Sequence, residues 1–438
     1  MAEIAPLTPL RYDTHKLPGG LASVVAPPYD VINAEQRAEL AARDPHNVVR
    51  LILPEGEGDA KYANAAELLE RFRAEKVLVR DDEPAFYRYD QTFTPPGEAG
   101  ARPITRRGFL ALVKLVPFSD RVVLPHERTL SGPKEDRLKL FRATQTNLSP
   151  GFMLYRDPEN ELRSPLEVAH VVGEFSTPDG IKHVLAKVSD AEAMRAITQK
   201  IAASSLLIAD GHHRYETALR YAGEVGAPSP LSASKYFMTF LVNGDDPELV
   251  VFPTHRHVHS LPSFSFDDLV SRAKETFEGT LLPKNADAPS ITRALREAGK
   301  SGPAIAVATA SGEVAILALR PDVDLGKHPT LGQTPEALRG TDVAILHMGI
   351  LEHLLGITRE AQAAKTNLYY PQDTAGALGE LRAGKGQALF VMNATPVDQV
   401  REVAEAGEVM PQKSTFFYPK VMTGLAIHTL EKDRLVHA

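Results

Sequence analysis

A buried strand and a helix meet in the stretch Leu206-Leu207-Ile208-Ala209-Asp210-Gly211-His212-His213-Arg214-Tyr215-Glu216-Thr217-Ala218-Leu219. The apolar run before Asp210 predicts a strand, and the residues after Gly211 predict a helix. A glycine at the junction lets the backbone turn sharply and lets a ligand approach it closely. The free N–H groups and the dipole at the start of the helix favour a negatively charged group. The stretch therefore predicts an anion site.

The polar side chains of this stretch suit a phosphate. Arg214 can hold a phosphate with two N–H donors, and His212 and His213 can add further donors. Asp210 stands where the strand ends, and its carboxylate could hold Mg²⁺ or orient a histidine. The alternative is structural: the junction is only a turn, and Arg214 pairs with a carboxylate such as Asp210 or Glu216.

The composition excludes several classes of protein. The chain has 438 residues, which predicts two or three domains, and its 43% hydrophobic and 24% charged residues are typical of a globular protein. It lacks an apolar run of about 18 residues and begins without a secretory signal, so we expect a cytoplasmic protein that does not cross a membrane. The absence of cysteine excludes disulfides and thiolate chemistry. The net charge of −7 argues against nucleic acid as a partner.

The order of predicted elements indicates an α+β (mixed α/β) fold. Alternating patterns predict strands over 86–93 and 107–115, and the segment 48–53 is β-like. Helices are predicted over 34–43, where Asn33 is the N-cap, and over 191–203. Hairpins and strand–helix pairs both occur, which argues against one uniform parallel barrel.

The quoted stretch also resembles a motif of the bacterial and archaeal domain of unknown function 1015 family. Further stretches that are similar to this family are Ala26-Pro27-Pro28-Tyr29-Asp30-Val31-Ile32, Asn47-Val48-Val49-Arg50-Leu51, Leu124-Pro125-His126-Glu127-Arg128-Thr129, Pro133-Lys134-Glu135-Asp136-Arg137, Leu241-Val242-Asn243, Pro253-Thr254-His255-Arg256 and Met410-Pro411-Gln412-Lys413-Ser414-Thr415. The resemblance covers nearly the whole chain. The name of the family states no function.

More distantly, the Gly-His-His-Arg turn is similar to the phosphate-binding box of the ParB/sulfiredoxin-like superfamily. That superfamily includes nucleotide-binding DNA-segregation proteins, an ATP-using repair enzyme and kinases of free serine. The resemblance implies a strand–turn–helix unit that grips nucleotide phosphates. A sulfiredoxin has a cysteine where His212 stands, so sulfiredoxin chemistry is excluded.

The resemblance implies a division of the chain. Residues 1–245 are expected to form a nucleotide-binding region of the ParB/sulfiredoxin-like type with a large insertion at about 55–175. The insertion would bring the block 126–137 to the phosphate box. Residues 246–438 would form a C-terminal α/β region, whose 410–420 loop could return to the site.

Four other polar segments supply candidate residues. His126 and Glu127 follow a predicted strand end, where α/β sites collect side chains, and the pair could supply a general base. His126, Lys134 and Arg137 could bind phosphate or nucleotide, although such a charged run is also typical of a solvated loop or helix start.

Lys413 could bind phosphate from a polar loop; the upstream glycines of a P-loop are missing there. The turn that contains Asp30 is often only a turn that the aspartate side chain closes. The resemblance places this turn beside the phosphate box and makes Asp30 a candidate for catalysis or metal binding.

These residues predict a phosphoryl-transfer enzyme that uses a nucleotide, ATP or ADP, and Mg²⁺ on a small hydroxyl-bearing metabolite, and the resemblance suggests an activity like that of a free-serine kinase. Arg214, the backbone of 211–213, Lys134 and Lys413 would hold phosphate, Asp210 would place Mg²⁺, and Glu127 or Asp30 would take the hydroxyl proton. Two alternatives stay open: a nucleotide-responsive DNA-binding or regulatory protein, and a non-catalytic metabolite sensor.

Overall fold

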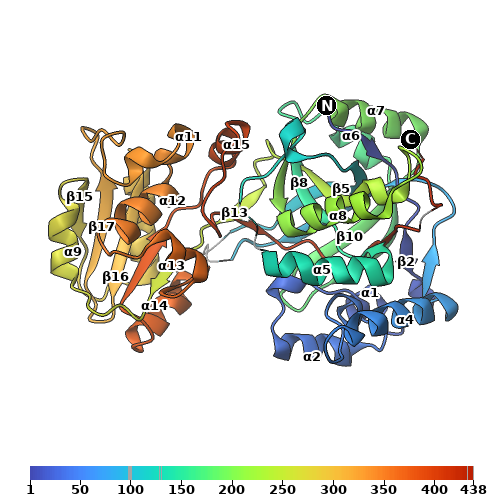
Figure 1. Cartoon of the computed structure of the whole chain (residues 1–438), viewed down its shortest axis with the longest axis horizontal. Coiled ribbons are helices and arrows are strands. Elements are labelled where there is room, and N and C mark those ends of the chain that lie inside the picture. Colours follow the sequence, from blue (N-terminus) through green and yellow to red (C-terminus); the bar gives the residue numbers. More distant parts are fainter. Residues whose placement is uncertain (97–100, 128, 130, 432, 438) are drawn as a thin grey trace. The chain divides into compact units, whose positions relative to one another are not determined.

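The computed structural model of the chain describes residues 1–96, 101–127, 129, 131–431 and 433–437 (Figure 1). These residues form two compact units. The first unit comprises Met1–Pro125, Thr129–Val250 and Pro419–Ala438, and the second comprises His126–Arg128 and Val251–Tyr418. Each unit is therefore assembled from segments that are far apart in the sequence.

The first unit is built on a mixed sheet. Its strands are β1 (Ile4–Ala5), β4 (Phe86–Phe93), β5 (Ile104–Lys114), β6 (Val123–Leu124), β8 (Gly151–Tyr155), β9 (His170–Ser176), β10 (Lys182–Val188), β11 (Leu206–Asp210) and β12 (Tyr236–Asn243). They follow the order β6-β11-β8-β12-β5-β4-β10-β9, with β1 beside β5. The pairs β6–β11 and β8–β12 are parallel, and the other pairs are antiparallel. The mixed α/β character expected from the sequence is confirmed.

Helices and two small strand pairs complete the first unit. The helices are α1 (Gly20–Val24), α2 (Ala34–Arg43), α3 (Val49–Ile52), α4 (Ala60–Ala74), α5 (Ser131–Thr144), α6 (Arg163–Glu167), α7 (Ala191–Ala202) and α8 (His212–Val225). The small pairs join β2 (Leu10–Tyr12) to β3 (Leu78–Arg80) and β7 (Thr146–Asn147) to β21 (His428–Thr429). In Figure 1, α5 lies beside α8, and the two helices pack against each other.

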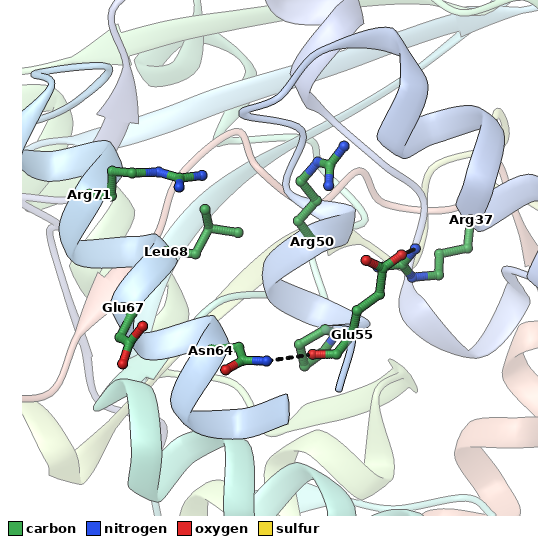
Figure 2. Close-up of a pocket in the computed structure, with 8 residues that line it drawn as sticks. Arg37, Arg50, Glu55, Asn64, Glu67, Leu68 and Arg71 are labelled. Atoms are coloured by element: carbon green, nitrogen blue, oxygen red, sulfur yellow. Dashed lines mark hydrogen bonds and ion pairs between the residues drawn. The ribbon is translucent and has the colours of Figure 1, made fainter. Parts of the chain in front are cut away.

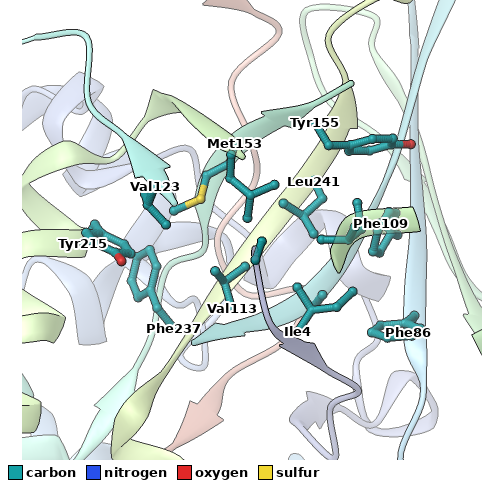
Figure 3. Close-up of a cluster of buried hydrophobic side chains, with 14 of the residues drawn as sticks. Ile4, Phe86, Phe109, Val113, Val123, Met153, Tyr155, Tyr215, Phe237 and Leu241 are labelled. Carbon is teal, nitrogen blue, oxygen red and sulfur yellow. The ribbon is translucent and has the colours of Figure 1, made fainter. Parts of the chain in front are cut away.

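The main core lies on one face of the large sheet. Phe109 and Val113 of β5 and Phe237 and Leu241 of β12 point to this face, because alternate residues of a strand point the same way (Figure 3). They pack with Tyr215 of α8 and with residues of α7. The strand residues between them, such as Leu110 and Phe240, are also buried, so the centre of the sheet is covered on both faces.

The C-terminal segment returns to the first unit. Met422 to Ile427 are buried there, and the backbone of Thr423 pairs with that of Ala26 and the backbone of Ile427 with that of Leu10. The carbonyl groups of Pro419 and Lys420 accept hydrogen bonds from side chains of β5 and β4. These contacts place the residues after the second unit against the first unit's own sheet.

The second unit has an antiparallel sheet in the order β15-β17-β16-β19-β14-β18. The strands of this sheet are β14 (Arg256–Val258), β15 (Phe277–Leu281), β16 (Ala304–Thr309), β17 (Val314–Leu319), β18 (Leu368–Tyr369) and β19 (Ala388–Met392). A separate pair joins β13 (Val250–Phe252) to β20 (Phe416–Tyr418). The helices of the second unit are α9 (Phe266–Ala273), α10 (Ala288–Gly299), α11 (Glu336–Arg339), α12 (Asp342–Ala344), a π-helix (Ile345–Glu352), α13 (Arg359–Ala364), α14 (Thr374–Arg382) and α15 (Val397–Glu405). Helices α10 and α14 pack on β16, β17 and β19 around a second core.

Local signals predicted most of these elements. Helix α2 begins after Asn33, whose side chain accepts from the Gln36 N–H at 2.8 Å in a full capping box, as expected. The strand predicted over 86–93 is β4. The prediction for 48–53 is wrong: α3 makes one helical turn there, and Asn47 accepts a hydrogen bond from the Val49 N–H at 2.9 Å. Burial of this apolar turn in a core with α1, α2 and α4 outweighs the strand preference of its β-branched residues.

The segment 55–175 contributes β4, β5, β6 and β8 to the large sheet, and β8 lies directly between β11 and β12. This segment is thus an integral part of the sheet that carries the Gly211 turn. That it is an insertion stays a prediction.

Candidate functional site

The quoted stretch forms the strand–turn–helix unit that its sequence predicts. Strand β11 ends at Asp210, and α8 begins at His212. Gly211 between them has φ +95°, a left-handed conformation that glycine adopts without strain. The first turn of α8 contains no acidic residue. The positive end of the helix dipole therefore faces the junction without a carboxylate from its own first turn.

Arg214 folds back over this junction. Its side chain is buried, and a Cβ atom added to Gly211 would lie 3.1 Å from the guanidinium carbon. Nη1 donates to the carbonyl of Pro150, and Nη2 donates to Oδ1 of Asp210 at 3.3 Å. The structure contains the pairing of Arg214 with Asp210, which is one of the two alternatives that the sequence left open.

Two more cations surround the Asp210 carboxylate. Lys420, from the C-terminal segment, donates to Oδ2 at 2.9 Å. Arg106, from β5, is close enough to Asp210 for the carboxylate to raise its pKa. The groups Arg214, Lys420 and Arg106 carry three positive charges, and Asp210 balances one of them.

Arg106 is itself unusual because it is almost fully buried. Its guanidinium lies 4.8 Å from the ring centre of Phe152, and Nη2 donates to Gln91 and to the carbonyl of Pro419. Within the described part of the chain, its Nε and Nη1 atoms have no hydrogen-bond partner. Burial lowers the pKa of Arg106 to about 9, so the side chain is still protonated at neutral pH.

The turn that contains Asp30 shares the electrostatic environment of this junction. Tyr29 lies in a short 3-10 helix (Tyr29–Val31), and burial raises the pKa of its hydroxyl. The charge of Asp30 raises this pKa further, whereas Arg214 and Arg137 lower it. Asp30 is exposed. The structure thus brings Tyr29 near the turn of Asp210 and Arg214, with Asp30 beside it.

Arg137 and Lys134 have protein partners. Arg137 is buried, stacks on the ring of Tyr29 at 4.2 Å, and donates to Asp136 and to the carbonyl of Ile52. Lys134 pairs with Glu216 at 2.6 Å. Residues 214 and 216 are about 200° apart around a helix, so Lys134 contacts a different face of α8 from the one that carries Arg214. That face borders a cavity of about 660 Å³.

His126, Glu127 and Lys413 belong to the second unit. The backbone N–H of Met410 donates to the carbonyl of His126 at 2.8 Å, and Nε2 of His126 lies 2.9 Å from the Thr415 hydroxyl. Lys413 is exposed and has φ +58°. The segments that carry the predicted residues 126, 127 and 413 are therefore bonded to each other.

A buried arginine supports the same loop. Arg256 donates to the carbonyl of Gln412 at 3.3 Å and to Nε2 of His347 at 2.9 Å. Nδ1 of His347 lies 2.6 Å from Oε1 of Gln362, which completes a buried chain of hydrogen bonds. Burial lowers the pKa of Arg256 to about 10, and the nearby charge of Glu127 opposes part of this decrease.

Two site residues were not identified as such from the sequence. Arg106 stands at the start of β5, outside the predicted strand 107–115, and nothing in its neighbourhood signals a site. Lys420 ends a polar loop of which only Lys413 was assigned. Among the described residues, no group of three or more His, Cys, Asp or Glu side chains could hold a metal ion. Asp210 as a magnesium ligand stays a prediction.

The comparisons with known proteins agree with the family resemblance. The sequence profile of the family described as "Protein of unknown function (DUF1015)" matches residues 4–344. No curated protein matches the chain. Within the described residues, no helix has the length and apolar character that a membrane crossing requires.

Distant similarity to solved structures is also found. A free serine kinase in complex with AMP is 15% identical with a TM-score of 0.35, over 68% of this chain and 84% of that chain. SbnI from Staphylococcus aureus, with a C-terminal truncation, is 11% identical with a TM-score of 0.37, over 74% and 90%. A conserved hypothetical protein from Pyrococcus furiosus is 15% identical with a TM-score of 0.33, over 68% and 87%.

Proposed function

The chain belongs to the DUF1015 family of proteins of unknown function, and from this premise we propose that its first unit grips the phosphates of a nucleotide at the Asp210–Arg214 turn and serves phosphoryl transfer to a small hydroxyl-bearing metabolite. The turn would act as a phosphate box of the ParB/sulfiredoxin-like type. A free-serine-kinase-like activity is the specific form of this proposal.

The excess of positive charge around Asp210 is the observation that carries the proposal. Arg214 and Lys420 both contact its carboxylate, and the buried Arg106 of β5 adds a third charge. The N-terminus of α8 adds the positive end of its dipole. Phosphate is the natural complement, because it offers two negative charges and several acceptor oxygens to the same donors.

Ligand binding would exchange partners at this junction. In the structure, the Asp210 carboxylate is the anion that pairs with Arg214 and Lys420. An entering phosphate would take over these donors, and His212 and His213 would add theirs from the first turn of α8. Arg106 stays in place in this scheme, because its contacts to Gln91 and Pro419 hold it below the surface.

Mg²⁺ fits this exchange. Both oxygens of Asp210 accept hydrogen bonds from cations, and both would become available when the cations turn to the phosphate. Mg²⁺ in nucleotide sites needs only one or two carboxylates besides phosphate oxygens and water, so Asp210 suffices on the protein side. The ion would neutralise charge on the transferred phosphoryl group.

Asp30 or Glu127 would take the proton of the acceptor hydroxyl. Asp30 belongs to the same unit as the turn and is exposed beside Tyr29. Glu127, His126 and Lys413 belong to the second unit, and their roles stay predictions. Lys134 and Arg137 as phosphate ligands would first have to leave Glu216 and Asp136.

Nucleotide binding to matched variants tests the proposal. We expect AMP, ADP or ATP to raise the melting temperature of the wild type, since a ligand that binds only the folded state stabilises it. Arg214→Lys should weaken that binding about 10-fold, because a lysine cannot make the forked contact. Arg220→Lys, on the same helix but in exposed pairs with Glu135 and Glu224, should not change it. Equal affinities for both variants, or no binding by the wild type, would refute the proposal.

A non-catalytic nucleotide sensor is the second candidate. One observation favours this candidate: both oxygens of the Asp210 carboxylate already accept hydrogen bonds from cations, so the carboxylate can be neutralised without a metal ion. Nucleotide binding that is independent of Mg²⁺, with no phosphoryl transfer from ATP to serine or to other small hydroxyl compounds, would favour the sensor over the enzyme.

A further inference from the structure

A second basic cavity lies in the first unit between α2, α3 and α4 (Figure 2). Its volume is about 400 Å³, within the range of small-molecule sites. Arg37 of α2, Arg50 of α3 and Arg71 of α4 line it, so its three cations come from three separate helices. It shares no lining residue with the junction around Asp210.

The donors of this cavity are only partly used. Arg37 donates Nε to the carbonyl of Leu53 at 2.9 Å and pairs with Glu55, so it is firmly held. Arg50 donates Nη2 to the carbonyl of Ala41 at 2.8 Å. Its Nε has no hydrogen-bond partner among the described residues, but this atom is shielded from solvent and therefore from the cavity.

Of the three arginines, Arg71 has the weakest contacts to the rest of the protein. Its side chain is 61% exposed, and its ion pair with Glu75 is long, at 3.9 Å. Figure 2 shows it reaching from α4 toward the space beside Leu68. Three arginines thus border one cavity: Arg37 is firmly held, Arg50 is half-buried, and Arg71 is exposed enough to change its contacts.

The charges and shape select a class of ligand. The three arginines outnumber the lining glutamates, Glu55 and Glu67, and Glu55 is already paired with Arg37. Forked guanidinium donors from three helices suit a tetrahedral group with three outer oxygens better than a planar carboxylate. Asn64 and Glu67, which lie on α4 as Arg71 does, offer acceptor oxygens for hydroxyl groups of the organic part.

We infer that this cavity is a second anion site, which binds the phosphate group of a small hydroxylated phosphate monoester. Arg50 and Arg71 would supply the new hydrogen bonds, and Arg37 would keep its bond to Leu53. Arg50 lies within 47–51, one of the stretches by which the chain resembles its family. The site is independent of the nucleotide proposed at Asp210.

Titration calorimetry with glycerol 3-phosphate, with inorganic phosphate and glycerol as separate probes, tests the inference on the full chain. We expect glycerol 3-phosphate to bind with a dissociation constant of about 1 mM or lower, and glycerol not to bind. Arg71→Gln should weaken this binding about 10-fold, the usual effect of losing a hydrogen bond to a charged group. Its exposure means that the variant should fold normally.

Two controls make the result specific. Arg43→Gln changes the same charge on α2 outside the cavity and should leave the binding unchanged. Arg214→Ala should also leave it unchanged, which separates this cavity from the phosphate box. Binding that survives both Arg71→Gln and Arg50→Gln, that is lost in Arg214→Ala, or that is absent in the wild type would overturn the inference. Binding of inorganic phosphate alone, without glycerol 3-phosphate, would overturn the assigned ligand class.

Discussion

Replacement of the Asp210 carboxylate should change stability and phosphate affinity in opposite directions. Asp210→Asn keeps the size of the side chain and removes the charge that Arg214 and Lys420 contact at 3.3 Å and 2.9 Å. The variant then lacks the negative charge that Arg214 and Lys420 contact in the structure. Phosphate would fill the place of the lost charge. We therefore expect a less stable protein that binds phosphate more tightly.

The magnitude follows from the two contacts. Each hydrogen bond to a charged group contributes about 1.5–3 kcal/mol, but the asparagine keeps an oxygen, and the Asp210 side chain is 17% exposed. We expect the free energy of unfolding of the ligand-free variant to fall by about 2–3 kcal/mol. At about 2 °C per kcal/mol for a unit of this size, the melting temperature should fall by about 4–6 °C.

Calorimetric melting with and without ADP, first in EDTA and then with Mg²⁺, measures both effects. In EDTA, saturating ADP should restore most of the lost melting temperature, and its affinity should exceed that of the wild type. With Mg²⁺, the wild type should gain affinity and the variant should not, if Asp210 holds the ion. Asp81→Asn is the matched control, because Asp81 pairs with Arg11 at 2.7 Å away from the junction. It should destabilise the protein without rescue by ADP. An Asp210→Asn variant as stable as the wild type, or one that binds ADP more weakly in EDTA, would refute the reasoning.

Three further predictions concern single positions. Lys413→Gly should raise the free energy of unfolding by up to about 1 kcal/mol, because glycine adopts the φ of +58° without strain; denaturant unfolding measures this change. The same variant should bind nucleotide more weakly in calorimetry if Lys413 contacts phosphate. Gly211→Ala should lower nucleotide affinity and destabilise the protein by about 1–3 kcal/mol, because φ is +95° and the new Cβ presses on Arg214 at 3.1 Å; full stability together with unchanged affinity would contradict this account of the turn. Burial lowers the pKa of His347 to about 3, so below about pH 6.5 the unfolded chain takes up a proton that the folded chain does not, and stability falls as the pH falls. Denaturant unfolding at pH 5 and pH 7 should show this fall, and His347→Gln should reduce the difference in unfolding free energy between the two pH values by about 2 kcal/mol; an unchanged difference would show that His347 titrates normally.

The division between sequence and tertiary structure is clear at the candidate site. The turn at Gly211 was predictable, because an apolar run, a glycine and a helical pattern are local signals that act within a few residues. The same holds for α2 with its Asn33 cap and for β4. The strand prediction for segment 48–53 is wrong because its conformation is not decided locally. Its β-branched residues favour a strand, but packing against other helices stabilises a helical turn.

The residues that surround Asp210 could be identified only from the tertiary structure. Lys420 reaches Asp210 across 210 residues of chain, and Arg106 arrives from a strand whose position in the sheet no local pattern specifies. The sequence by itself determined a strand–turn–helix unit at Gly211, and the anion site expected at the start of this helix stays a prediction. The tertiary structure decided that Arg214 faces inward to Asp210, that two further cations join it, and that Glu127 and Lys413 fold with the second unit. The physical reason is that a backbone turn depends on neighbouring residues, whereas a buried ion pair forms only when the sheet brings distant charges together and removes water from them.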